Sequence, residues 1–381
     1  MVTVKEMDLG GRTLRLETGK LAKQASGSVL ARYGDTVVLC TVVGADEPKE
    51  GMDYFPLQIE FREKTAAVGK IPGGFFKREA RPSEKEILTC RLIDRPLRPL
   101  FPEDFMCEVQ VICTVYSSDQ ENDADVIAAV GASAALMVSN LPFEGPMGEV
   151  RVGRINGEYI VNPTHTQLKE SDMDMIIGGT ADSIVMVEGD AKELSEADIL
   201  GAIKFAHENI KKICAMQTEF AAERNVTNRE VKAVEYDQEL KNAVKELAAK
   251  TISEIHRSDV TKDERSQKYK ELYESITESL KEKYPDQEKV IAKHFDDIQY
   301  YDMREMILTE GRRLDGRKTT DIRPITCEVG YLPRNHGSAL FTRGETQSLT
   351  SMTLGTKSDQ QIIDGLMPED KKRFMLHYNF P

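Results

Sequence analysis

Residues 16–44 read LETGKLAKQASGSVLARYGDTVVLCTVVG, and residues 327–355 return to the same pattern as CEVGYLPRNHGSALFTRGETQSLTSMTLG. With one gap, three glycines of the first copy align with three of the second: Gly19, Gly27 and Gly34 with Gly330, Gly337 and Gly344. In both copies apolar and polar residues alternate on either side of a glycine–acid pair, which is typical of two strands joined by a tight turn. The chain therefore repeats part of its own architecture.

A further strand is expected after each copy, DYFPLQIEF at 53–61 and RFMLHYNF at 373–380. Beyond that strand the first copy continues, whereas the second stops with the sequence. We therefore expect residues 301–381 to be the opening part of a second core that is incomplete in this chain.

The rest of the first copy, as far as residue 215, has an α+β pattern. The stretch NDADVIAAVGASAALMVSN (122–140) suits a helix packed closely on a sheet, and its Asp123 and Asp125 are interpreted as capping carboxylates rather than metal ligands. A hairpin is expected to turn at Asn156-Gly157, followed by two strands within residues 173–189. Ser195 and Asp198 then predict the start of a long helix. These signals together predict one sheet flanked by helices.

Residues 216–300 predict an all-helical domain of two or three helices. No glycine occurs from Ala202 to Glu310, and apolar residues recur at helical spacing. Those of the first predicted helix are Leu240, Val244, Leu247, Ile252 and Ile255. The abundant charge of this segment is interpreted as a solvated face rather than a binding surface.

Composition excludes several other classes of protein. The chain is 40% hydrophobic and 30% charged, which is globular composition for more than one domain. Its 6 cysteines form no C-x-x-C pair, so they are expected to be reduced core residues rather than zinc ligands or disulfides. No segment has the apolar length of a signal peptide or a membrane span, and we expect a cytoplasmic protein with no membrane partner.

Positive charge gathers in one stretch of a chain whose net charge is −13. Within residues 62–101, the segment KIPGGFF (70–76) is expected to be a loop, because proline and glycine interrupt any period. A helix should follow, since Ser83 and Glu86 form a capping box, with Ile87, Leu88 and Leu92 as its apolar stripe. Three arginines would share one face if Pro96 only kinks this helix: Arg91, Arg95 and Arg98.

Three segments carry a resemblance to a known family: IPGGFFKREARPSEKEILTCRLIDRPLRPLFP (71–102), GASAALMVSNLPFEGPMGEVRVG (131–153) and LPRNHGSALFTRGETQSLTSMTLGT (332–356). They resemble the bacterial polynucleotide phosphorylases, in matching order along the whole chain. The resemblance implies two RNase PH-like cores (ribosomal protein S5 domain 2-like fold) joined by an all-helical domain. Here the domains would be residues 1–215, 216–300 and, incomplete, 301–381.

The family's function is implied in the same way. Its members are 3′-to-5′ phosphorolytic exoribonucleases and polyribonucleotide nucleotidyltransferases of mRNA degradation. Three chains form a ring around a channel for single-stranded RNA. The partners implied are RNA, inorganic phosphate, nucleoside diphosphates and two further copies of the chain, with Mg²⁺ as the cofactor. No metal ligand is identified in this chain.

The resemblance also implies site residues. The RNA-binding candidates are Phe75, Phe76, Lys77, Arg78 and Arg81 of the loop and Arg91, Arg95 and Arg98 of the following helix. Lys77 stands where the family has an arginine, which keeps the charge and loses the planar fork. Without the resemblance, the two phenylalanines would be interpreted as core residues. In the second copy, His336 and Arg343 are candidates near the active site, and Arg343 is equally interpretable as a solvated surface residue.

Two other interpretations stay open. The family's serine-rich phosphate loop, its metal-binding aspartates and its KH and S1 modules have no counterpart in this sequence, so the 381-residue chain is expected to be inactive by itself. It could then serve as a non-catalytic RNA-binding or ring-assembly module. A small-molecule phosphate enzyme that uses Gly73-Gly74 as a cradle is a third interpretation, although no G-x-x-x-x-G-K-[ST] pattern supports it.

Overall fold

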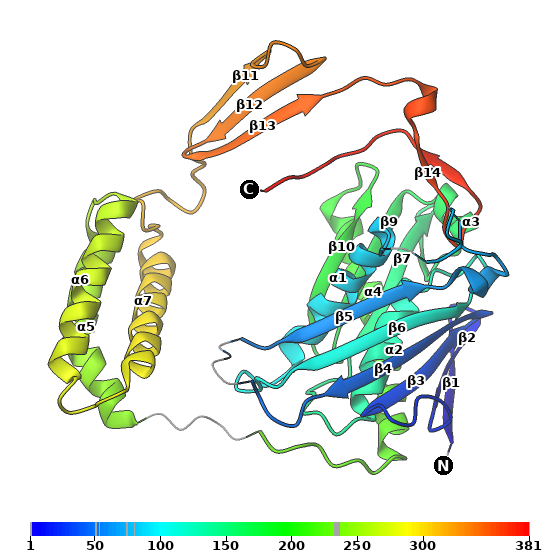
Figure 1. Ribbon diagram of the computed structural model, residues 1–381, viewed down its shortest axis with the longest axis horizontal. Helices are drawn as coiled ribbons and strands as arrows, with labels where there is room; N and C mark the ends of the chain where they lie inside the picture. Colours follow the sequence, from blue (N-terminus) through cyan, green and yellow to red (C-terminus); the bar gives the residue numbers. More distant parts are fainter. Residues whose placement is uncertain are drawn as a thin grey trace. The chain divides into compact units, whose positions relative to one another are not determined.

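The computed structural model describes residues 2–49, 52, 54–73, 75–79, 81–231 and 237–380 (Figure 1). The chain divides into two compact units, one formed by Met1–Ala233 with Gln360–Pro381 and the other by Val234–Asp359. The domain boundaries at residues 215 and 300 stay a prediction.

A six-stranded sheet forms the first part of the first unit. Its strands are β1 (Thr3–Leu9), β2 (Arg12–Thr18), β3 (Gly27–Tyr33), β4 (Thr36–Gly44), β5 (Leu57–Glu63) and β6 (Val109–Ser117), in the order β1-β2-β3-β4-β6-β5. Only β5 and β6 are parallel neighbours. Parallel neighbours need a crossover, and this crossover carries η1 (Thr65–Val68), the basic loop, α1 (Glu84–Leu97) and η2 (Arg98–Leu100). The basic loop therefore leaves the sheet at its edge strand.

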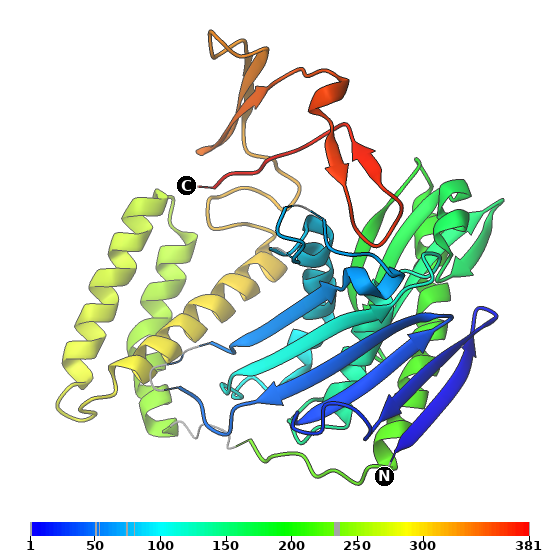
Figure 2. The ribbon, with the colours of Figure 1, turned by 45° about the vertical axis from the view of Figure 1, so that its right-hand side comes forward.

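A second sheet corrects the expectation of one sheet flanked by helices. The strands β7 (Gly148–Ile155), β8 (Glu158–Val161), β9 (Met173–Gly179) and β10 (Ile184–Ala191) form a separate sheet in the order β10-β9-β7-β8. Helix α2 (Asp125–Met137) contacts β3 and β4 of the first sheet and β7 of the second (Figure 2). Its residues from Asp125 to Leu136 are all buried. A helix buried on every side shows no one-sided apolar period, so its sequence could not reveal the second sheet.

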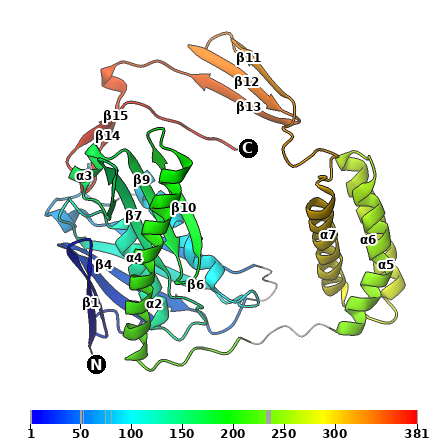
Figure 3. The ribbon, with the colours of Figure 1, turned by 180° about the vertical axis from the view of Figure 1, so that it is seen from behind.

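The local predictions for this part of the chain are confirmed. The hairpin of β7 and β8 turns at Asn156 and Gly157, with φ of 52° and 85°. Ser195 and Asp198 form the capping box of α4 (Glu196–Ala222), which packs on β7 and β9 (Figure 3). A short helix, α3 (His165–Glu170), was not anticipated.

Among its described residues, the second unit contains three α-helices: α5 (Gln238–Arg257), α6 (Lys262–Leu280) and α7 (Glu288–Glu310). They confirm the helical prediction and enclose a small core of Leu240, Val244, Ala248, Ile252, Ile276, Leu280, Ile291 and Phe295. The prediction that Leu247 belongs to the apolar stripe is wrong, since its side chain is 45% exposed. Ala248 occupies the buried position instead, because the next residue of a helix points about 100° away.

The repeat is confirmed in the backbone. In the first copy β3 pairs with β4 from Gly27↔Val42 to Tyr33↔Thr36. In the second copy β12 (Gly337–Arg343) pairs with β13 (Thr346–Met352) from Gly337↔Met352 to Arg343↔Thr346, so the two hairpins share one register. The preceding strand, β11 (Ile325–Val329), pairs with β12 as β2 pairs with β3.

The segment after the second repeat differs from expectation. It forms the short hairpin of β14 (Gln361–Ile363) and β15 (Asp370–Lys372), which belongs to the first unit. The strand predicted over residues 373–380 is wrong, because these residues have no strand structure. Strand β5 of the first copy is held by its hydrogen bonds to β6, and residues 373–380 pair with no strand in the described part of the chain.

The cysteines are free, as expected. Cys40, Cys107, Cys113 and Cys214 are buried, Cys90 is partly buried and Cys327 is exposed. Core packing thus accounts for most of them, and Cys327 is the exception.

Candidate nucleic-acid interface

The loop between β5 and α1 presents two aromatic rings to solvent. Phe75 is 93% exposed and Phe76 is 80% exposed. Their ring centroids lie 5.4 Å apart with an interplanar angle of 85°, an edge-to-face arrangement. The rings are therefore not core residues. Gly74, part of the alternative phosphate cradle, lies outside the described residues.

Three cations flank these rings without a partner. Lys77, Arg78 and Arg81 are exposed, and none forms a hydrogen bond or ion pair with another residue in the part of the chain that the structure describes. The loop's one carboxylate, Glu79, lies 2.5 Å from the Nζ of Lys64, and this hydrogen bond lowers the pKa of Glu79. The loop therefore offers aromatic faces and unpaired positive charge together.

The start of α1 is set by its capping box, as predicted. The Glu86 amide donates to the Ser83 hydroxyl at 3.2 Å, and the Ser83 amide donates to Glu86 Oε2 at 2.6 Å. The other carboxylate oxygen of Glu86 accepts from the amide of Glu63 in β5 at 2.9 Å. Glu86 is thereby held against the sheet.

The position of Glu86 determines which face of α1 is buried. Ile87 is 52% exposed and Leu88 is 48% exposed, while Leu92 is buried. The predicted stripe is thus wrong for Ile87 and Leu88 and confirmed for Leu92. A hydrogen bond to a strand distant in sequence overrode the apolar pattern.

Helix α1 continues through Pro96 to Leu97, which fulfils the condition for a shared arginine face. Arg91 is exposed and has no partner among the described residues. Arg95 forms an ion pair with Glu188 of β10. Of these two arginines, Arg91 is the one available to a ligand without breaking an existing interaction.

Arg98 supports the loop structure before β5. Its Nη2 lies 2.6 Å from Asp94, and the guanidinium donates to the carbonyls of Phe55 and Leu57, each at 3.1 Å. The side chain also lies over the Phe55 ring, 5.9 Å from its centroid. These interactions give Arg98 a structural role that its spacing in the sequence did not indicate.

His336 and Arg343 belong to the second unit, whereas the loop residues belong to the first. The Leu354 amide donates to His336 Nδ1 at 2.9 Å, so this nitrogen acts as an acceptor. Arg343 ends β12, is exposed, and has no side-chain partner among the described residues.

Asp123 and Asp125 each accept a backbone amide at the start of α2, Asp123 Oδ1 from Asp125 at 3.4 Å and Asp125 Oδ1 from Val126 at 2.7 Å, and both also form ion pairs. The N-cap of α2 is Ala124, which makes no side-chain cap. Asp123 lies 3.1 Å from Lys85 Nζ, and Asp125 forms an ion pair with Arg151. Burial alone would lower the pKa of Lys85, but its carboxylate neighbours raise it well above its usual range. Both aspartates are thus already occupied.

One buried acid was missed by the sequence analysis. Glu149 of β7 is 1% exposed, and neither carboxylate oxygen has a hydrogen-bond partner in the described structure. Burial, reinforced by the nearby charge of Asp125, raises the pKa of Glu149 well above its usual value. The available signal was weak, since Glu149 is one of two charged residues in the stretch MGEVRV.

We expect Glu149→Gln to stabilise the protein increasingly as pH rises. Because folding raises the pKa of this carboxyl group, its protonation stabilises the folded protein. This contribution is complete below the unfolded-state pKa of about 4.3, and it is lost as the pH rises through the folded-state pKa. The stability gap between variant and wild type should therefore widen by about 1.4 kcal/mol per pH unit within that window. Urea unfolding at a series of pH values measures the gap. Parallel stability profiles would show that Glu149 binds no extra proton on folding.

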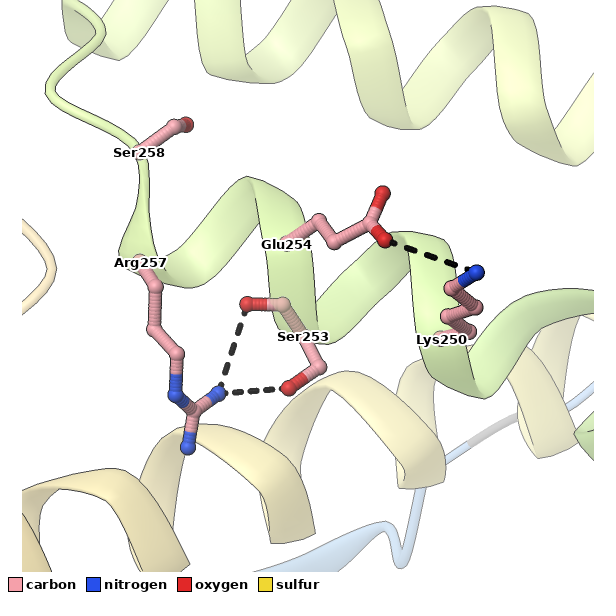
Figure 4. A pocket seen from close by; sticks show the side chains of 5 residues that line it. All are labelled: Lys250, Ser253, Glu254, Arg257 and Ser258. Atoms are coloured by element: carbon pink, nitrogen blue, oxygen red, sulfur yellow. Dashed lines mark hydrogen bonds and ion pairs between the residues drawn. The ribbon is translucent and has the colours of Figure 1, made fainter.

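A surface recess on α5 supplies no catalytic group. It is lined by Lys250, Ser253, Glu254, Arg257 and Ser258 (Figure 4). The Arg257 guanidinium donates to the carbonyl and hydroxyl of Ser253, and Lys250 lies 4.0 Å from Glu254. Arg257 also forms ion pairs with Asp302 and Glu310, which do not line the recess, so its charge is already engaged.

Comparisons with known protein families agree with this architecture. Domain 1 of the 3′ exoribonuclease family matches residues 10–142 and 321–381, and domain 2 of that family matches residues 145–209. The family described as polyribonucleotide nucleotidyltransferase, RNA binding domain, matches residues 239–318. Domain 1 thus matches both copies of the internal repeat. No described helix is both long and apolar enough to cross a membrane.

Individual relatives are similar along the whole chain. The polyribonucleotide nucleotidyltransferase of Chlorobium phaeobacteroides is 51% identical over 99% of this chain and 54% of its own length. That of Geotalea uraniireducens is 50% identical over 100% of this chain and 55% of its own length. The chain thus spans about half the length of these relatives.

Among solved structures, rice Rrp46 matches 58% of this chain and 94% of its own with a TM-score of 0.44 and 14% identity. The family matches and the relatives confirm the resemblance to polynucleotide phosphorylases. The chain, with domain 1 matched in both of its repeats, belongs to the 3′ exoribonuclease family.

Proposed function

We propose that this chain is part of a 3′-to-5′ phosphorolytic exoribonuclease, a polyribonucleotide nucleotidyltransferase acting in mRNA degradation, and that its first core binds and threads single-stranded RNA. The observation that carries the proposal is the exposed pair of Phe75 and Phe76 beside unpaired cations. Aromatic rings stack on bases of any sequence, at ~1–3 kcal/mol per base, and adjacent cations neutralise phosphates.

The relatives support the reaction class. Their name describes nucleotidyl transfer on polyribonucleotides, and they match this chain at about half identity over nearly all of its length. On this basis the proposed partners are single-stranded RNA, inorganic phosphate, nucleoside diphosphates and two further copies of the chain. The proposed compartment is the cytoplasm.

Magnesium is proposed only for the whole protein. In the described part of this chain, no group of three or more His, Cys, Asp or Glu side chains is placed to hold a metal ion. Asp123 and Asp125, the acids at the start of α2, are paired with Lys85 and Arg151. The residues present therefore do not fit the ion, and no step here uses it.

The cations of the loop provide the first test. Replacing Lys77, Arg78 and Arg81 by alanine should weaken binding of oligo(A) and oligo(U) alike, because phosphates carry no sequence. The slope of log affinity against log salt should flatten by about 0.7 for each phosphate that the variant no longer neutralises. A matched control replaces the exposed Lys20, Lys23 and Lys212 of the same unit by alanine. An unchanged slope in the loop variant would refute the assignment.

The aromatic rings are tested separately. Phe75→Leu or Phe76→Leu should lower RNA affinity by about tenfold with little change in the salt slope, because stacking releases no counterions. Tyr116→Leu, which alters an aromatic side chain of the same unit that is 56% exposed, is the control. Equal losses of affinity in the control and the loop variants would contradict the proposal.

A non-catalytic RNA-binding or ring-assembly module is the alternative. Exposed Ile87 and Leu88 on α1 favour an assembly surface, since paired exposed aliphatic side chains often mark the interface between chains. Phosphate-dependent release of nucleoside diphosphates by the whole protein, of which this chain is proposed to be a part, discriminates the enzyme from this module.

A further inference from the structure

The β14–β15 hairpin is fixed to the residue at the start of the candidate RNA loop. Lys70 Nζ donates to the carbonyls of Gly365 at 3.1 Å and Met367 at 3.0 Å. The side-chain amide of Gln120 donates to the intervening carbonyl, that of Leu366, at 2.6 Å. Two side chains of the first core thus hold three consecutive carbonyls of the hairpin tip.

The tip is inserted into the first core rather than resting on it. Leu366 is 5% exposed and joins the hydrophobic cluster of the first core, against which Ala67 and Val68 of η1 also pack. On the same hairpin Ile362 is 59% exposed and Ile363 is 42% exposed. Of these three side chains, Leu366 is the buried one, so it anchors the hairpin to the first core.

The same hairpin reaches the other end of the loop. Lys372 Nζ lies 2.6 Å from Glu84 Oε2 at the first turn of α1. On the near side, a Cβ added to Gly73 would lie 2.9 Å from Asp364 Oδ2, so the loop backbone passes directly beside the hairpin. The hairpin thus touches the chain on both sides of Phe75 and Phe76.

We propose that this hairpin is a strap that restrains the ends of the loop and thereby raises its affinity for single-stranded RNA, an inference that rests on the function proposed above. A loop with fixed ends has fewer conformations to lose when its rings stack on bases. Leu366 and Gln120 are positioning residues in this scheme, because they act on RNA only through the loop.

The test uses changes that leave the charge unaltered. The variants Leu366→Ala and Gln120→Met, singly and together, remove the anchor without altering electrostatic attraction to RNA. The double variant should lower oligo(A) affinity by about fivefold, with the salt slope unchanged, since only pre-organisation is removed. Ile363→Ala, on the exposed side of the same hairpin, is the matched control and should bind as wild type.

Loop motion is measured independently of RNA. A nitroxide is attached at Lys77→Cys in a Cys327→Ser background, since Cys327 is the exposed native cysteine. The double variant should sharpen the nitroxide spectrum, with unfolding by urea confirming an intact core. An unchanged spectrum would overturn the strap.

Increased mobility with unchanged RNA affinity would overturn the link between strap and RNA. A different result would refute the proposed function: normal RNA binding by the Phe75→Leu and Phe76→Leu variants, in which the β14–β15 hairpin is unchanged.

Discussion

Gly27→Ala should destabilise the first unit severely, whereas Gly337→Ala, the same change at the equivalent position of the second repeat, should be tolerated. Both glycines begin the first strand of their hairpin and pair at the same place in the register. A Cβ on Gly27 would lie 2.1 Å from the carbonyl oxygen of Ala135, a backbone atom of buried α2. For a Cβ on Gly337, the one close atom would be the flexible end of Met352, Cε at 2.9 Å, while the Cβ of Met352 lies at an ordinary 3.7 Å.

The expected magnitudes separate clearly. Backbone atoms cannot rotate away, so Gly27→Ala should cost about 3 kcal/mol or more in the free energy of unfolding. Gly337→Ala should change it by less than about 1 kcal/mol, because a methionine tip moves aside and alanine restricts the unfolded chain. Urea unfolding followed by circular dichroism measures both. Equal losses of stability in the two variants would contradict this expectation, because they would show that both glycines are packed equally closely against neighbouring atoms.

Local chemistry explains which parts of the fold could be predicted. The two hairpins follow from turns that need a left-handed residue, and Gly34 and Gly344 indeed have φ of 60° and 62°. Helix starts follow from capping boxes such as that of Ser195, which depend on residues three apart. Such signals are complete within a short window of sequence.

Interactions between distant residues explain the failures. The carboxylate of Glu86 turned inward because it accepts from the Glu63 amide, which left Ile87 exposed. Within the candidate site, the exposure of Phe75 and Phe76 agrees with the family resemblance, whereas the residues alone favoured an interpretation as core side chains. The hydrogen bonds that Arg98 donates to the carbonyls of Phe55 and Leu57 could not be predicted from the spacing of arginines along one helix.

We expect the purified 381-residue chain to release no ADP from poly(A), phosphate and magnesium. Phosphorolysis needs free cationic donors for the attacking phosphate and stabilisation of the charge that develops. The cations near the start of α2 already form ion pairs with carboxylates. Arg151 pairs with Asp125 and, at 2.5 Å, with Asp174, while Lys85 lies 2.8 Å from Glu63 and 3.1 Å from Asp123.

Loss of a single electrostatic stabiliser typically lowers turnover ~100- to 1,000-fold, so a site whose donors are all paired should be silent. End-labelled poly(A) with and without phosphate measures the reaction, with Arg151→Ala as the matched variant. Phosphate-dependent ADP release that Arg151→Ala abolishes would contradict the expectation and place an active site in the first unit. Phosphate-dependent ADP release that survives this change would indicate another phosphorolytic site, whereas a contaminating hydrolytic nuclease would release AMP with or without phosphate. If the chain releases no ADP but binds RNA in a way that requires Phe75, the first core is the part that holds RNA, and the chemistry takes place elsewhere.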